Sequence, residues 1–425
     1  MIRADPRRSD ALAGDTRIPS SLDSRTLSSA VRRLLLARGL RAFADGFVSL
    51  LLPAHLLGLG LSPLQVGAIA TGTLLGSGAL TLCVGLRANR IGTRTLLTAA
   101  AGLMCATGLG FAAITSFWPL LVVAVVGTLN PSSGDVSVFL PLEHAVLARV
   151  VTDRERTGAF ARYSLVGALA AALGALAAGA PELAHQWLGV APRVLYPWMF
   201  VLYATLGLLA GVIYRRLPAA GAAQAGPTAP LEQSRRVVYT LAALFGLDAF
   251  GGGFIVQSLL ALWLFERFQL SVAAAGTIFF WTGLLSALSY LVAARIARRI
   301  GLVNTMVFTH LPANLLLLLL PFASDLGWVI ALLLARSALS QMDVPTRSSY
   351  VMAVVSPAER PAAASITSVP RSLASALGPL LAGYLLGLSP FGWPLIVAGG
   401  LKIVYDFLLL ATFRAVRPPE EASSA

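Results

Sequence analysis

The sequence predicts an all-α polytopic membrane protein with twelve transmembrane helices in two related bundles of six. Composition, recurring apolar runs and an internal repeat lead to this prediction. Of the 425 residues, 57% are hydrophobic and only 12% are charged, whereas soluble domains carry about 25% charged residues. Apolar runs of about 20 residues, the length that crosses a bilayer, recur along the chain. Such runs must be helical, because lipid offers the backbone no hydrogen-bond partners.

The apolar runs form two sets of six, separated by a stretch rich in Ala, Gly and Pro from Leu217 to Gln233. The first six helices are predicted at residues 34–57, 64–86, 94–114, 118–146, 160–180 and 195–214. The second six are predicted at residues 237–264, 272–294, 302–321, 326–353, 362–388 and 391–413. The resulting segments are a disordered tail (1–33), an N-terminal bundle (34–214), a flexible linker (215–236), a C-terminal bundle (237–413) and a second tail (414–425).

The positive charges predict the orientation of the chain in the membrane. The net charge is +13, and nearly all the cations are arginines. The predicted loops on one side hold most of them, and the opposite loops hold little beyond Arg193 and Arg267. Because cytoplasmic loops collect cations, both termini are predicted to lie in the cytoplasm, with the protein in the cell's inner (cytoplasmic) membrane. Nucleic-acid binding is disfavoured, since the arginines are scattered rather than clustered.

The two predicted bundles repeat each other in sequence. The fifth and eleventh helices share a motif of the form Ala-Leu-Gly, at Gly174 and Gly378, and a second glycine follows each motif at the same distance. Glu155-Arg156 and Glu359-Arg360 precede the two motifs at equal spacing. Duplicated six-helix halves are typical of transporters that rock two bundles about a central site.

The loop between the second and third predicted helices resembles the signature loop of the major facilitator superfamily. That family's pattern is Gly, an apolar pair, Asp, Arg, Gly and further cations, and Asn stands here in place of the Asp. The residues that match this conformational-switch loop are Gly85, Asn89, Arg90, Gly92 and Arg94. The Gly378-Pro379 pair also resembles a Gly-Pro motif of some family members. The resemblance covers residues 34–413, and it implies alternating access around a cavity lined by the first and fourth helices of each half.

Several charged residues fall inside the predicted helices, where a charge costs about 3 kcal/mol or more. The candidate substrate and proton residues are Arg41, Asp45, Asp135, Glu143, Asp248, Asp343, Arg347 and Arg371. One Asp lies near the middle of each helix that the resemblance places around the cavity. A shared water-filled cavity would remove most of the cost of burying these carboxylates. Proton transfer is expected through one of them, with Asp45 and Asp343 as the leading candidates because each has an Arg four residues away.

A structural interpretation of the same charges remains open. Charges four residues apart can pair within one helix and fasten the bundle. The possible pairs are Arg41 with Asp45, Asp343 with Arg347, and Lys402 with Asp406. Prolines inside the fourth and tenth helices are expected to kink them, because proline removes an intrahelical hydrogen bond. These prolines are Pro131, Pro141 and Pro345.

The expected function is secondary active transport of a small solute, coupled to protons, by a monomer in contact with membrane lipids. Efflux of a drug-like or toxic compound by antiport is favoured, because the cavity helices are rich in Ala, Gly, Leu and Phe. The alternative within transport is uptake of an organic or inorganic anion, with Arg41, Arg347 and Arg371 as ligands. A non-transporting sensor or scaffold is the alternative of another class. The sequence contains no metal cluster, phosphate loop or catalytic triad, so no enzyme activity, metal, cofactor or nucleic acid is expected.

Overall fold

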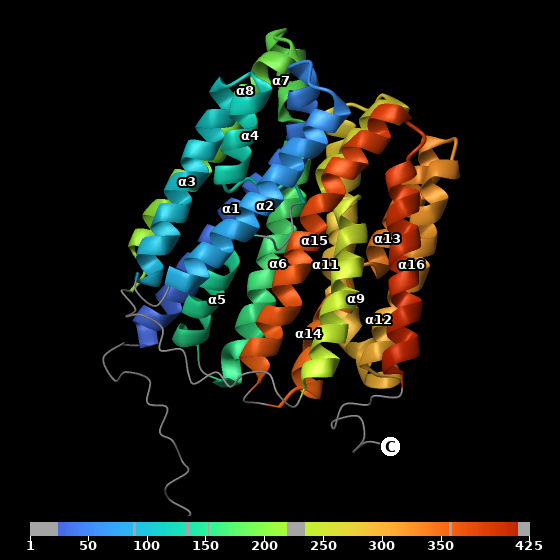
Figure 1. Cartoon of the computed structure of the whole chain (residues 1–425). Coiled ribbons are helices and arrows are strands. Elements are labelled where there is room, and N and C mark those ends of the chain that lie inside the picture. Colours follow the sequence, from blue (N-terminus) through green and yellow to red (C-terminus); the bar gives the residue numbers. More distant parts are fainter. Residues whose placement is uncertain are drawn as a thin grey trace, which may run out of the picture.

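The computed structural model describes residues 24–87, 91–132, 137–151, 153–218, 234–356 and 359–414. The first half contains α1 (Ser24–Gly58), α2 (Pro63–Arg87), α3 (Thr93–Ala113), α4 (Phe117–Val126), α5 (Phe139–Val150), α6 (Asp153–Ala177), α7 (Ala180–Leu188) and α8 (Pro192–Arg215). The second half contains α9 (Arg235–Gly253), α10 (Gln257–Phe268), α11 (Val272–Ile300), α12 (Leu302–Leu319), the short η2 (Leu320–Phe322), α13 (Leu326–Leu339), α14 (Asp343–Val354), α15 (Arg360–Leu388) and α16 (Trp393–Phe413). The two halves lie side by side (Figure 1).

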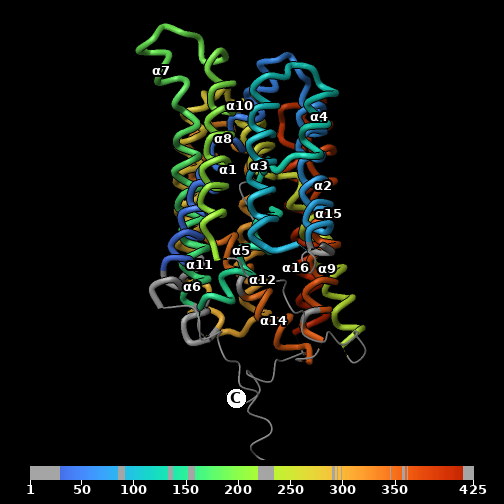
Figure 2. Tube along the Cα trace, turned by 90° about the vertical axis from the view of Figure 1, so that its left-hand side faces the viewer, coloured from blue at the N-terminus to red at the C-terminus, as the bar shows by residue number. Residues whose placement is uncertain are grey.

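The helices confirm the predicted fold class. In the described residues, ten helical segments are long and apolar enough to cross a membrane. Two further crossings are divided into shorter helices, α4 with α5 and α13 with α14. The short helix α7 lies at the end of the bundle opposite the C-terminus (Figure 2). The protein is therefore an all-helical polytopic membrane protein.

Several helix boundaries differ from the predicted ones. Helix α1 begins at Ser24 rather than at residue 34, and its buried face already includes Ala30, one turn before Leu34. Helix α6 begins at Asp153 rather than at residue 160, and the α7 that follows it was not predicted. Much of the predicted linker, residues 219–233, lies outside the described residues.

Three predicted continuous helices are interrupted: those at residues 118–146, 237–264 and 326–353. The prolines expected to kink two of them instead accompany full breaks. Pro141 and Pro345 are each the third residue of a new helix, α5 and α14, and a proline in the first turn sacrifices no intrahelical hydrogen bond. In the third case, α9 ends on the run Gly251–Gly253, which has low helix propensity.

The repeated glycines have the same role in both halves. A Cβ added to Gly174 would lie 2.0 Å from the carbonyl oxygen of Phe43 in α1. A Cβ added to Gly378 would lie 2.4 Å from a backbone carbon of Gly253 in α9. Small residues allow helix backbones this close an approach inside a membrane. The repeated glycine motif therefore corresponds to the same close helix contact in each half, α1 with α6 in the first and α9 with α15 in the second.

The halves meet through α2 with α15 and through α6 with α11. The α2–α15 contact is close, because a Cβ on Gly67 would lie 2.3 Å from the carbonyl oxygen of Pro379. The backbone N–H of Leu380, next to that proline, donates to Thr71 Oγ1 at 2.9 Å. The Gly-Pro motif singled out in the sequence thus lies at the interface between the two halves.

Candidate functional site

A buried cluster in the first half joins Arg41, Glu143, Tyr163 and Tyr214, from α1, α5, α6 and α8. Arg41 Nη2 donates to Glu143 Oε2, and Arg41 Nε donates to Tyr214 Oη at 2.8 Å. The hydroxyl of Tyr163 donates to Glu143 Oε2, and that of Tyr214 donates to Glu143 Oε1 at 2.6 Å. Arg41 also lies over the ring of Phe139, 4.1 Å from its centroid. We call this the Arg41 cluster, and its one cation and one anion compensate each other.

Asp45 lies one turn after Arg41 on α1, outside this cluster, and retains 8% exposure. The predicted pairing of Arg41 with Asp45 is not the one formed, because Arg41 is bound by Glu143. Among the described residues, the Asp45 carboxylate accepts no hydrogen bond and forms no ion pair. The groups that act on it electrostatically at longer range are Arg41 and Arg38 of α1 and Tyr203 of α8. Asp45 is therefore a buried carboxylate without a direct counter-ion.

A larger buried cluster lies in the second half, and we call it the Asp248 network. Its members, from α9, α12, α14 and α16, are Asp248, His310, Asn314, Asp343, Arg347, Lys402 and Asp406. Asp248 accepts from Lys402 Nζ at 2.7 Å and from Arg347 Nη2 at 2.9 Å. Arg347 also donates to Asp343, as the spacing of the two residues predicts. Two cations are thus shared between two carboxylates.

The network continues into α12. His310 Nε2 lies 3.6 Å from Asp248 Oδ1, and His310 Nδ1 lies 2.8 Å from Asp406 Oδ1. Asn314 Nδ2 donates to Asp406 Oδ2 at 2.9 Å. The predicted local pairing of Lys402 with Asp406 is therefore wrong. Each of the two binds a buried partner on another helix, which joins α16 to both α9 and α12.

Of the remaining predicted site residues, those that the structure describes belong to neither cluster. Arg371 is exposed on α15 and has interactions of its own. Gly85 falls in the last turn of α2, Gly92 precedes α3, and Arg94 is exposed in the first turn of α3. Three predicted site residues, Asp135, Asn89 and Arg90, lie outside the described residues.

Sequence reasoning missed three members of the two clusters, and it considered Asn314 only as a polar residue that could line a cavity. His310 carried a usable signal, since it lies four residues before Asn314 in an otherwise largely apolar helix. Tyr163 and Tyr214 carried none, because tyrosine is frequent near the ends of membrane helices. Only the fold shows that both hydroxyls turn inward to one carboxylate.

The helix breaks of the two halves meet. The backbone N–H of Ser258, at the start of α10, donates to the carbonyl oxygen of Pro131 in the break between α4 and α5, at 3.0 Å. Beside it, Asn130 Oδ1 accepts from the backbone N–H and the hydroxyl of Ser132. Irregular backbone at membrane depth is tolerated where protein buries it or where it lines a cavity. Interrupted helices also form the substrate sites of many transporters.

A second contact joins the halves at the end of the bundle that carries α7. The Glu182 carboxylate of α7 accepts from the backbone N–H groups of Val272 and Ala273, at 2.6 and 3.1 Å. These donors form the start of α11, so a side chain of the first half caps a helix of the second. The two halves are therefore in direct contact at this end of the bundle.

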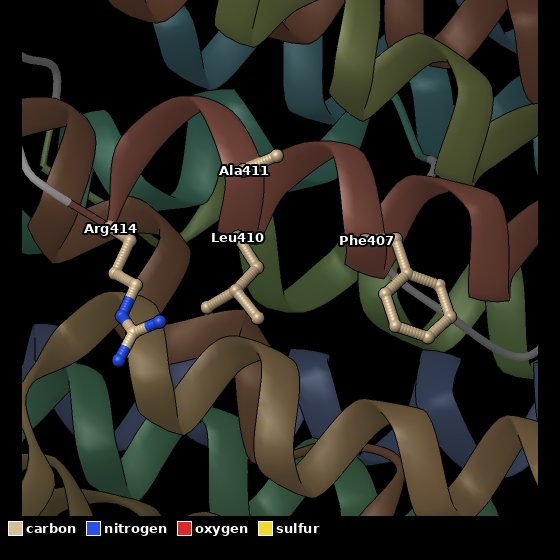
Figure 3. A pocket seen from close by; sticks show the side chains of 4 residues that line it. All are labelled: Phe407, Leu410, Ala411 and Arg414. Atoms are coloured by element: carbon tan, nitrogen blue, oxygen red, sulfur yellow. The ribbon is translucent and has the colours of Figure 1, made fainter.

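A hollow on the molecular surface lies beside the last turns of α16 (Figure 3). Phe407, Leu410, Ala411 and Arg414 line it. The Phe407 ring is 58% exposed on a membrane-spanning helix, as expected for a surface that faces lipid. None of the lining residues belongs to either charged cluster, so this hollow is not the candidate site.

The chain matches the family model of the Major Facilitator Superfamily over residues 34–340 and 242–425. It is 26% identical over 413 residues to the uncharacterized membrane protein YJR124C of Saccharomyces cerevisiae. The alignment covers 89% of this chain and 92% of the yeast protein.

Several solved structures have a similar fold. One is a bacterial homolog of the human lysosomal transporter Spinster, inward-facing and unoccupied, with a TM-score of 0.68 and 14% identity over 92% of this chain and 96% of that chain. Another is the nucleoside transporter NupG, with a TM-score of 0.69 and 14% identity; the match covers 91% of this chain and 99% of that chain. A third is the human organic anion transporter MFSD10, with a TM-score of 0.61 and 20% identity; the match covers 90% of this chain and 99% of that chain.

The solved structures, at these identities, show a shared fold. The family match extends over most of the chain, and the structure contains the expected two repeated halves of membrane-spanning helices. This multi-pass membrane protein belongs to the Major Facilitator Superfamily of secondary transporters.

Proposed function

We propose that this transporter couples the movement of a small organic solute to protons, and that Asp45 is the residue that binds the proton. The observation that supports this is the different pairing of two neighbours on α1. Arg41 is bound by Glu143, whereas Asp45 is buried without an ion pair among the described residues. A buried carboxylate that lacks a counter-ion is stabilised by taking up a proton.

Coupling requires the proton affinity of Asp45 to change between two conformations. Arg41 lies four residues before Asp45, and this spacing allows the two side chains to pair on one face of α1. In the structure, Arg41 is turned to Glu143. In the opposite conformation, Arg41 would pair with Asp45 and favour the ionised carboxylate. Alternating access between the two halves provides the two arrangements.

Asp343 is less suited to this role, although the sequence made it an equal candidate. Its carboxylate is bound by Arg347, and Arg347 is also bound by Asp248. Release of Asp343 would require the other connections of this network to rearrange. The contrast in pairing favours Asp45 over Asp343 as the coupling residue.

For the direction of transport we propose export of a drug-like compound in exchange for protons, from a monomer in the cytoplasmic membrane with both termini inside. The apolar composition of the cavity helices and the loop arginines support this choice. Uptake of an anion through Arg41 and Arg347 loses support, because carboxylates neutralise both guanidinium groups.

A transport assay tests the proposal. A thermal-shift screen of the purified protein against organic cations, anions and neutral amphiphiles identifies a ligand, because a ligand of the folded state raises its Tm. The radiolabelled ligand is then followed in proteoliposomes under an imposed pH difference. We expect Asp45→Asn to abolish gradient-driven movement while binding persists without its dependence on pH. Gradient-driven movement that survives in Asp45→Asn, or that stops only in Asp343→Asn, would contradict the assignment.

A further inference from the structure

Arg336 of α13 differs from the other cations at membrane depth. Arg41, Arg347 and Lys402 are each bound by a carboxylate. In the part of the chain that the structure describes, the Arg336 side chain forms no hydrogen bond, ion pair or contact with an aromatic ring, and its Nε is buried without a partner. The side chain as a whole is partly buried, and a charge that is drawn from water without a partner destabilises the fold.

The position of Arg336 places it near the middle of the membrane. Helix α13 begins at Leu326, so Arg336 lies about 15 Å along the helix, roughly half of the hydrocarbon thickness. Val329 and Leu333 precede it by seven and three residues, and both are buried. Their spacing puts Arg336 on the same face. The lipid-facing side of α13 is marked by Trp328, which is 69% exposed.

Arg336 also lies one turn before the break at residues 340–342, where α13 ends and α14 begins. The hydroxyl of Ser286 in α11 contacts the carbonyl oxygen of Ser337 at 3.4 Å, so α11 supports this end of α13. Interrupted helices at the midplane form binding sites in secondary transporters. Arg336 is therefore placed at the depth and at the type of backbone where such sites occur.

The three buried aspartates of the second half are bound elsewhere and do not neutralise Arg336. Asp343 is bound by Arg347, Asp248 by Arg347 and Lys402, and Asp406 by residues of α12. The C-terminal end of α13 offers a partial negative charge, but such an interaction contributes about 0.3–1 kcal/mol. That contribution is smaller than the cost of the unpaired charge, so the described residues leave Arg336 without a full counter-charge.

We propose that Arg336 binds the carboxylate of the transported solute, an organic anion with an apolar body. A guanidinium group offers two parallel N–H donors that match the two oxygens of a carboxylate. The buried apolar side chains of Val329 and Leu333 share the face of Arg336 and suit the apolar part of such a solute. This inference rests on the proposed transport function and adds the chemical class of the solute.

Ligand binding to the purified full-length protein in detergent tests the inference. The probes are benzoate, naphthoate and phenylbutyrate, each compared with its neutral amide, and the readout is the shift in Tm with probe concentration. We expect at least one carboxylate to bind the unaltered protein more tightly than its amide. Arg336→Gln should weaken that carboxylate about ten- to hundredfold and leave the amide unchanged. Arg336→Lys should recover part of the affinity.

Two further arginines serve as comparisons. Arg371→Gln removes the cation that the sequence proposed as an anion ligand, and Arg267→Gln removes one that donates to the Pro321 carbonyl. Both variants should keep the preference for the carboxylate. Without probe, Arg336→Gln should be at least as stable as the unaltered protein, since an unpaired and partly buried charge is lost. A structural role for Arg336 predicts lower stability instead.

The inference is overturned if no carboxylate is preferred over its amide, if the preference survives in Arg336→Gln, or if Arg371→Gln removes it. These measurements need no proton gradient. Asp45→Asn should keep the carboxylate preference while losing gradient-driven transport. The two proposals can therefore fail separately.

Discussion

Corresponding regions of the two halves carry their buried charges in different ways. In the first half, Arg41 is bound by Glu143, and Asp45 one turn away has no ion pair among the described residues. In the second half, Asp248 is bound by Lys402 and Arg347 together, and Arg347 also binds Asp343. Both regions include the first helix of a six-helix half. The first leaves one carboxylate without an ion pair among the described residues, whereas the second holds its carboxylates in a connected network.

This difference suggests that duplicated halves have separate tasks. The glycine crossing between the first and fifth helices is retained in both halves, at Gly174 and Gly378. The charged residues beside it are arranged differently. In the proposed division, the connected network across four helices would stiffen the second half, and exchange of partners by Arg41 would let the first half respond to protons. Four substitutions test this division.

The largest effect is expected for Asp248→Asn. The change leaves Lys402 and Arg347 without their shared carboxylate and should lower the free energy of unfolding by about 3–5 kcal/mol. Thermal unfolding in detergent measures the loss. Adding Lys402→Met to the variant should restore part of the stability, because one unpaired charge is removed. Unchanged stability in Asp248→Asn would show that the network does not fasten the second half.

Glu143→Gln should have an intermediate effect, about 1–3 kcal/mol. Arg41 loses its carboxylate but can turn to Asp45, four residues later, which compensates part of the loss. The double variant Glu143→Gln with Asp45→Asn removes this alternative and should lose more than the sum of the single variants. Simple additivity in the unfolding measurement would mean that Arg41 does not exchange partners.

A smaller effect is expected for Glu182→Gln at the contact between α7 and α11. The amide oxygen keeps one acceptor for Val272 or Ala273 but lacks the negative charge, so the loss should be about 0.5–2 kcal/mol. Because this contact joins the halves at the end bearing α7, its loss should favour opening there. The rate of thiol labelling at Ala273→Cys, with Cys83 and Cys105 replaced, should rise. An unchanged labelling rate would argue against a gating role.

Asp45→Asn should have the smallest effect on stability, less than about 1 kcal/mol, and could stabilise the fold. The carboxylate has no ion pair to lose among the described residues, and asparagine has the same shape. Asp343→Asn is the matched comparison, because Asp343 is bound by Arg347, and it should cost more. Equal losses in the two unfolding measurements would remove the contrast between the halves.

The sequence predicted the fold class, the two halves and most crossings, because these depend on long apolar runs and on a repeated glycine motif. It also predicted the Asp343–Arg347 pair, which is local in the chain. It did not predict that Lys402 binds Asp248, or that Asp406 binds His310, because these pairs depend on how α9, α12 and α16 pack. Local spacing favoured a Lys402–Asp406 pair, but buried partners on other helices were within reach.

The helix breaks were also beyond sequence reasoning. Prolines and glycines mark where a helix is weak, but tertiary contacts decide whether it kinks or ends. The hydrogen bond from Ser258 to Pro131 joins backbone groups freed by two breaks in different halves. Each break supplies the partner that the other needs, and no local pattern in the sequence contains that information.

The most direct test of Asp45 as the proton site is infrared difference spectroscopy of the protein between acidic and alkaline pH. A buried carboxyl group that takes up a proton gains a carboxylic C=O band and loses its carboxylate bands. We expect this band in the unaltered protein and in Asp343→Asn, and we expect it to be absent in Asp45→Asn. A band that persists in Asp45→Asn, or that disappears in Asp343→Asn, would contradict the assignment of the proton to the first half.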